Sequence, residues 1–129
     1  MATAARSFTI AYAQHDARDG KDTSYSQAGA RAAKLATGEL VEILAQQREG
    51  QEAPWAALRA EQATQTVKVE SVVTPDGAPA ADASSALVRV GYTLTTTPIS
   101  GPARASSEQI ALRLDHTADG WRVGALPWA

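Results

Sequence analysis

The chain has 129 residues, no cysteine and a formal net charge of −2, which fits one compact domain spanning residues 1–129. The absence of cysteine excludes disulfides, thiolate-bound zinc and a thiol nucleophile, and the weak negative charge leaves no electrostatic footprint for nucleic acid. No apolar run reaches the roughly 20 residues that a membrane-spanning helix needs, and the polar-interrupted start is unlike a signal peptide.

Helical periodicity opens the chain. Residues 2–16 predict a first helix, with Phe8 and Tyr12 four residues apart on one face. After a charged loop, Ser24 and Gln27 fit a capping box, in which Ser24 is the N-cap and the Gln27 side chain reaches back to it. A helix is expected to follow directly from this box.

Further helical signals follow before residue 64. Thr37 is expected to cap the next stretch, which carries Leu40 and Leu44 on one side and stops at Gly50. Pro54 suits the first position of a short helix that includes Trp55. Counting the stretches before and after Thr37 as one segment, we expect three N-terminal helical segments.

The periodicity changes to that of strands near Thr64. Residues 64–73 alternate apolar and polar side chains, and residues 86–98 form the longest predicted strand. Residues 75–85 and 99–109 are rich in Pro, Gly, Ser and Ala and are expected to be loose connections. With the C-terminal stretch, a sheet of about four antiparallel strands is predicted.

The C-terminal stretch predicts a hairpin. Asp119-Gly120 is the two-residue signal for a type I′ turn, and this placement sorts apolar side chains from polar ones across the two strands. The expected pairs are Ala118 with Trp121, His116 with Val123, Leu114 with Ala125, and Leu112 with Pro127. The resulting fold class is α+β, with the helices covering one face of a curved antiparallel sheet.

Four segments carry a resemblance to a known superfamily: "FTIAYAQHDARD", "LATGEL", "VRVGYTLTTT" and the ending "LRLDHTADGWRVGALPWA". They resemble the nuclear-transport-factor-2-like, or cystatin-like, proteins, whose helices pack into a bent, cone-like sheet. Within that superfamily the chain is similar to extracytoplasmic domains of actinobacterial and Gram-positive conjugative-transfer and type IV secretion proteins of the VirB and Tcp type, and to Mce-associated membrane proteins.

This resemblance implies a non-enzymatic scaffold domain that binds protein partners in a cell-envelope complex. Self-association would use the sheet positions Arg113, Leu126 and Trp128. Such proteins usually carry an N-terminal transmembrane helix. The expected location is therefore the extracytoplasmic face of the membrane if an anchor has been removed, and the cytoplasm otherwise.

The same superfamily contains small-molecule enzymes of the SnoaL and ketosteroid-isomerase kind, and this is the alternative function. Tyr12, Tyr92 and His116 would then line a pocket in the cone, with His116 as general base. The simpler role for the two tyrosines is packing in the core. The simpler interpretation of His116 is a partly solvated residue near the turn. Because no carboxylate falls on the predicted inner face of the last two long strands, no catalytic pair is assigned.

The stretch "HDARDGKD" raises the question of a metal site. Its His and Asp residues do not have the spacing of an oxygen-ligand loop, and Arg18 and Lys21 lie between the acids. We therefore expect a solvated loop there, with no metal and no cofactor.

Overall fold

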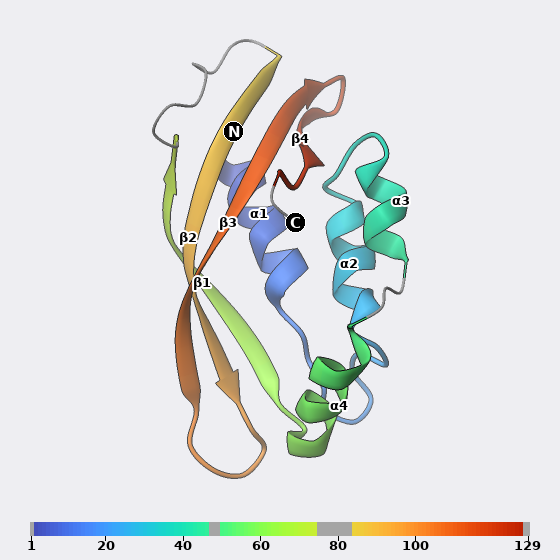
Figure 1. Cartoon of the computed structure of the whole chain (residues 1–129), viewed down its shortest axis with the longest axis vertical. Helices are drawn as coiled ribbons and strands as arrows, with labels where there is room; N and C mark the ends of the chain where they lie inside the picture. The colour runs from blue at the N-terminus through green and yellow to red at the C-terminus, as the bar shows by residue number, and fades with distance from the viewer. Residues whose placement is uncertain (1, 47–49, 75–83, 128–129) are drawn as a thin grey trace.

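The computed structural model describes residues 2–46, 50–74 and 84–127, and it has the predicted α+β fold (Figure 1). The helices precede the strands in the chain. They are α1 (Ala2–Ala13), α2 (Ser26–Ala33), α3 (Leu40–Ala45) and α4 (Glu52–Glu61), and the strands are β1 (Thr64–Val73), β2 (Ser85–Thr97), β3 (Arg104–Thr117) and β4 (Gly120–Ala125).

The four strands form one antiparallel sheet in the order β1-β2-β3-β4. The strands are long and strongly twisted, and α1, α2 and α3 lie on one side of the sheet while α4 lies at the end where β1 begins (Figure 1). This arrangement gives two layers with a core between them, as expected when helices cover one face of a sheet.

The core between α1 and the sheet is filled with side chains. Phe8 of α1 meets Val90, Leu112, Leu114 and Val123 of the strands, and all five residues are inaccessible to solvent. Alanines on α1 and α2 add to this cluster, and their small side chains allow the helices to approach the sheet closely. The centre of the fold is therefore packed rather than hollow.

The described residues form four helices before the sheet, one more than the three helical segments expected. The connection between α2 and α3 pairs with β4 instead of continuing a helix. Thr37 N–H donates to Val123 O at 2.8 Å, and Val123 N–H donates to Leu35 O at 3.0 Å. These bonds cover the free edge of β4. The N-cap of α3 is Glu39 rather than the predicted Thr37.

The predicted capping box also differs from the structure. Tyr25 is the N-cap of α2 and makes no side-chain cap. The Gln27 side-chain oxygen accepts from Thr23 N–H at 2.6 Å, while the Ser24 hydroxyl bonds to that of Ser26. Helix α3 ends at Ala45, several residues before the predicted stop.

Strand β3 begins earlier than predicted. Residues 104–109 were expected in a loose connection, but they pair with β2 from Thr96↔Arg104 to Gly91↔Gln109. All six are exposed and polar or small, so no hydrophobic alternation marks them. Backbone pairing with the long β2 strand extends β3 to Arg104, whose guanidinium also donates to both Glu61 carboxylate oxygens, at 2.7 and 2.8 Å.

The β3–β4 hairpin exists, but its register differs from the prediction by two residues. The observed pairs are Thr117↔Gly120, His116↔Trp121, Asp115↔Arg122, Leu114↔Val123 and, after a bulge, Arg113↔Ala125. Ala118 and Asp119 therefore form the turn, which the Thr117 hydroxyl closes by donating to Gly120 O at 2.8 Å. Because side chains alternate with a period of two, this shift leaves Leu114 and Val123 on the core face.

Candidate functional site

Two of the predicted pocket residues meet at a small cavity. Tyr12 from α1 and Tyr92 from β2 line a space of about 130 Å³ together with His15 and Tyr25 from the α1–α2 connection. We call this space the tyrosine cavity. His116, the third predicted residue, does not line it. His116 is exposed near the hairpin turn, where its ring lies 5.0 Å from that of Trp121.

The hydroxyl groups of the three tyrosines are close enough to influence one another. Burial raises the pKa of Tyr25, and the nearby Tyr12 raises it further. Burial also raises the pKa of Tyr92, with added contributions from Glu108, Tyr12 and Tyr25. The phenols of Tyr25 and Tyr92 therefore stay protonated and neutral at physiological pH.

His15 is the most constrained polar residue at this cavity, with only 4% of its surface exposed. Its Nδ1–H donates to Gln65 Oε1 at 2.7 Å and to Ala13 O at 3.1 Å, and the ring stacks on Tyr25 with centroids 3.9 Å apart. Because both Nδ1 partners are acceptors, the neutral ring carries its proton on Nδ1. Burial lowers the pKa of His15, which favours this neutral form.

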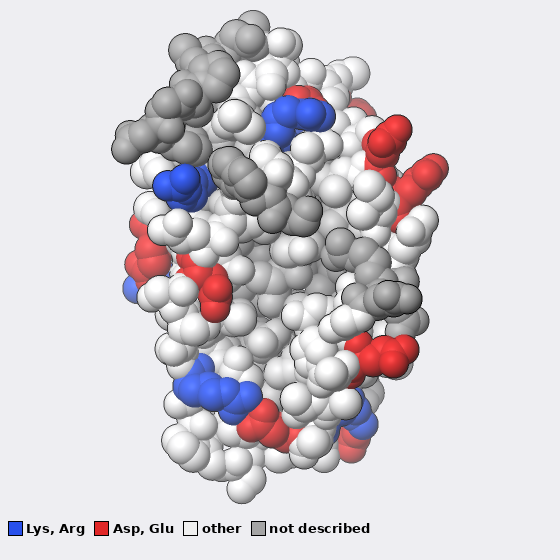
Figure 2. All heavy atoms as spheres, viewed as in Figure 1, with Lys and Arg blue, Asp and Glu red and all other residues white. Residues whose placement is uncertain are grey.

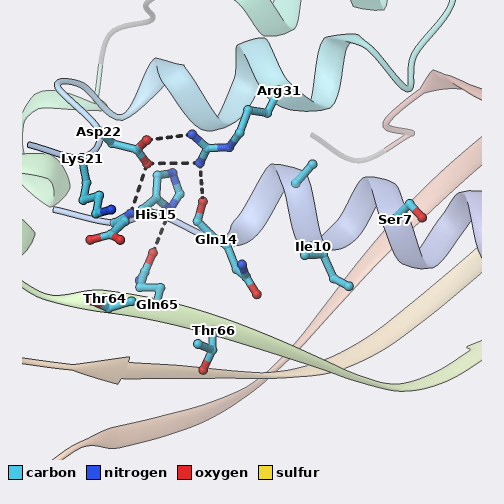
Figure 3. A pocket seen from close by; sticks show the side chains of 12 residues that line it. Ser7, Ile10, Gln14, His15, Lys21, Asp22, Arg31, Thr64, Gln65 and Thr66 are labelled. Carbon is cyan, nitrogen blue, oxygen red and sulfur yellow. Dashed lines mark hydrogen bonds and ion pairs between the residues drawn. The ribbon is translucent and has the colours of Figure 1, made fainter. Parts of the chain in front are cut away.

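The other side of His15 borders an open groove of about 630 Å³ between α1, the α1–α2 connection and β1 (Figure 3). Arg31 reaches across it from α2. It binds both Asp22 oxygens, at 2.7 and 3.1 Å, and donates to Gln14 O at 2.9 Å. The groove wall is therefore held by a network of internal hydrogen bonds.

The acids of "HDARDGKD" pair with arginines. Asp16 contacts Arg18 at 2.6 Å, and Asp19 contacts Arg59 of α4 at 2.9 Å. Figure 2 shows the same mixing on one face of the molecule, where acidic and basic side chains are interspersed. Across residues 2–46, 50–74 and 84–127, no group of three or more His, Asp or Glu residues is arranged to hold a metal ion.

A second groove, of about 650 Å³, lies between α3 and the β3–β4 hairpin. We call it the α3 groove. Its apolar lining comes from both elements and includes Ile43, whose surface is 43% exposed. The predicted interface residues Arg113 and Leu126 line it, whereas Trp128 lies outside the described residues. The apolar lining residues are Leu40, Ile43, Leu44, Ala125 and Leu126.

An ion pair crosses the hairpin side of the α3 groove. Arg113 and Asp115 lie two residues apart on β3, with Arg113 Nη2 at 3.1 Å from Asp115 Oδ2. Their side chains extend over Gly124 of β4, where an added Cβ would lie 1.9 Å from the same Asp115 oxygen. The missing side chain at position 124 therefore makes room for this ion pair.

Sequence reasoning did not assign His15, Tyr25 or Ile43 to a site. His15 was considered only as a metal ligand, because its partner Gln65 is 50 residues away. One usable signal was the count of tyrosines, since the chain has three and all of them line one cavity.

No protein-family model and no curated protein matches this chain. Among solved structures, the chain is weakly similar to the intermembrane-space region of the chloroplast protein ARC6, at 13% identity and a TM-score of 0.37 over 71% of this chain and 70% of that one. A likeness at this level carries no functional argument. None of the described helices has the length and apolar character needed to span a membrane.

Proposed function

We propose that the chain is a non-enzymatic protein-interaction domain whose binding surface is the α3 groove. The observation that carries this proposal is an apolar groove that stays open beside a core that is filled. Leu40 and Leu44 form buried parts of the groove, and Ile43 beside them is 43% exposed. Exposed apolar side chains gathered around a hollow are typical of protein-binding surfaces.

The rim of the groove matches this role. Glu39 lies on the α3 side and the Arg113–Asp115 pair on the hairpin side, so both signs of charge flank an apolar floor. An apolar centre within a polar rim is the common anatomy of a transient interface. The expected partner is a protein segment that inserts one or two apolar side chains and contacts these charges at its edges.

The biological setting remains a proposal drawn from the sequence resemblance. In it, the partner is a subunit of a cell-envelope conjugative-transfer or type IV secretion-like complex, and the domain acts at the extracytoplasmic face of the membrane. A second copy of this chain is the other candidate occupant. In that case sedimentation would show a concentration-dependent dimer that dissociates when Ile43 is replaced by Asp.

Helix α3 offers a matched pair of positions for the test. Val41 is 37% exposed and does not line the groove, whereas Ile43 is similarly exposed and does. A photo-crosslinking amino acid placed at 43 in host cells is expected to give a discrete protein adduct that is missing when it is placed at 41. The captured protein is then purified and its affinity measured with both aspartate variants.

We expect Ile43→Asp to weaken binding at least about ten-fold, because it buries a charge in an apolar contact, and Val41→Asp to leave it within about two-fold. Equal effects of the two substitutions, or no adduct specific to position 43, would show that the α3 groove is not the binding surface.

Small-molecule binding is a second candidate function, and the tyrosine cavity favours it. Its volume of about 130 Å³ is below the roughly 300–1,000 Å³ of pockets for drug-sized ligands. The described residues that line it include no carboxylate. The cavity therefore suits a small head group rather than the substrate of a SnoaL-like or ketosteroid-isomerase-like reaction.

A further inference from the structure

All three tyrosines of the chain converge on the tyrosine cavity, although they are far apart in the sequence. Tyr12 lies in the last turn of α1, Tyr25 precedes α2 and Tyr92 lies in the middle of β2. The apolar part of the lining is completed by Ala13, Gly29 and Leu94. A cavity lined by three aromatic residues is a specific chemical environment, because aromatic rings offer π-systems as well as apolar surface.

The rings are held in place by stacking partners outside the cavity or at its edge. The Tyr12 ring stacks on buried Phe8, with centroids 5.6 Å apart and planes 12° apart. The Tyr25 ring stacks on His15, which Gln65 in turn fixes. Because these contacts immobilise the rings before any ligand arrives, binding costs little side-chain entropy.

The charges around the cavity favour a cation over an anion. The described lining contains no Lys or Arg, and Glu108, opposite Tyr92 in the sheet, places a carboxylate near the Tyr92 hydroxyl. His15 is held neutral by its burial and so does not repel a positive group. The faces of aromatic rings carry partial negative charge, which adds to the same preference.

We propose that the tyrosine cavity binds a quaternary ammonium group of the size found in choline. The trimethylammonium group is compact and has no N–H, so it needs aromatic contact rather than hydrogen-bond acceptors. A Ca²⁺ or Mg²⁺ ion would be expected to need carboxylate ligands, and the described lining contains none. Glycine betaine has the same trimethylammonium group as choline but also carries a carboxylate, which the Glu108 carboxylate would repel. Choline is therefore expected to bind more tightly than glycine betaine.

The first experiment compares choline with its neutral isostere, 3,3-dimethyl-1-butanol, in an NMR titration of protein labelled with ¹³C in its tyrosine rings. Three ring systems are expected, one for each tyrosine. Choline is expected to shift all three saturably, while the isostere binds at least about ten-fold more weakly. Equal binding of the two compounds, or no binding of choline, would overturn the proposal.

Variants assign the effect to the rings. Tyr92→Leu and Tyr25→Leu are expected to weaken choline binding roughly two- to thirty-fold, the range for losing one cation–π contact. Tyr92→Phe keeps the ring and should stay within about three-fold, which separates loss of the π-system from loss of the hydroxyl. Trp121→Leu removes an aromatic side chain at the hairpin and should leave choline binding unchanged, and if it weakened binding as much as Tyr92→Leu, the site would not be this cavity.

Two further arms define the source of the group and its relation to the α3 groove. Sedimentation with phosphatidylcholine vesicles distinguishes a lipid head group from a free small molecule, since only the former brings the protein down with the vesicles. Ile43→Asp is expected to leave choline binding intact. Failure of the choline test and failure of the protein-binding test are therefore independent results.

Discussion

The tyrosine cavity and the α3 groove lie on the same molecule but are built in opposite ways. At the cavity, a polar contact joins residues far apart in the sequence, since His15 binds Gln65 fifty residues away. At the α3 groove, the Arg113–Asp115 ion pair is local to β3, and the apolar side chain of Ile43 remains open to solvent.

This difference separates two kinds of recognition. Long-range hydrogen bonds fix the walls of a cavity before binding, which suits a small rigid ligand. An apolar groove with local polar contacts leaves stabilisation to be completed by a partner. The arrangement explains why we assign a small cation to one region and a protein to the other.

The largest effect is expected at Gly29, which connects the two regions. It lines the tyrosine cavity, and an added Cβ would lie 2.1 Å from the backbone oxygen of Leu44, which lines the α3 groove. Gly29→Ala should force α2 and α3 apart and lower the free energy of unfolding by about 1–3 kcal/mol, measured by denaturant titration.

The control for Gly29→Ala is Ala30→Leu, at an exposed position on the same helix. We expect it to change the free energy of unfolding by less than about 0.5 kcal/mol. If Gly29→Ala were equally neutral, the close contact between α2 and α3 would not couple the two regions.

A smaller effect sharpens the contrast between long-range and local ion pairs. Arg31→Gln removes the contacts to Asp22 and to Gln14 O, whereas Arg113→Gln removes one pair between neighbours on a strand. Both arginines are partly exposed, so we expect about 1 kcal/mol for Arg31→Gln and less than about 0.5 kcal/mol for Arg113→Gln.

Hydrogen exchange should show where each arginine acts. Arg31→Gln is expected to speed exchange at Asp16 N–H, which donates to Asp22 Oδ2 at 3.1 Å, while Arg113→Gln leaves it unchanged. Faster exchange at Asp16 N–H in both variants would show that the two arginines do not act in separate parts of the molecule.

The third effect is a gradual dependence of stability on pH. Burial lowers the pKa of His15 below its ordinary value, so the unfolded chain takes up this proton first as the pH falls. Stability is therefore retained above about pH 6.5 and decreases as the pH falls from there through the folded-state pKa. The lowered pKa values of Asp16 and Glu61 act only in more acidic solution.

Thermal unfolding between pH 8 and pH 5 tests this dependence. His15→Gln should flatten the decrease in melting temperature, while His116→Gln, at an exposed position, should keep it. A wild-type melting temperature that did not fall toward pH 5 would show that His15 does not govern stability in this range.

Much of the fold could be predicted from local patterns. The alternation in residues 64–73 predicted β1 with its observed ends, and the helical spacing of Phe8 and Tyr12 placed both on α1. The candidate site was predicted only in part. Tyr12 and Tyr92 do line one cavity, but His116 lies near the hairpin turn instead. Its predicted place in the pocket rested only on the alternation of side chains along the strand.

The α+β class, the strand positions and the helical character of the first half follow from periodicity, since side-chain patterns with a period of 2 or 3.6 act within a few residues. Three features required the folded chain: the break between α2 and α3, the polar start of β3 and the gathering of three tyrosines around His15. Each depends on a partner in another element, and no local pattern encodes which backbone group or ring will be there to meet it.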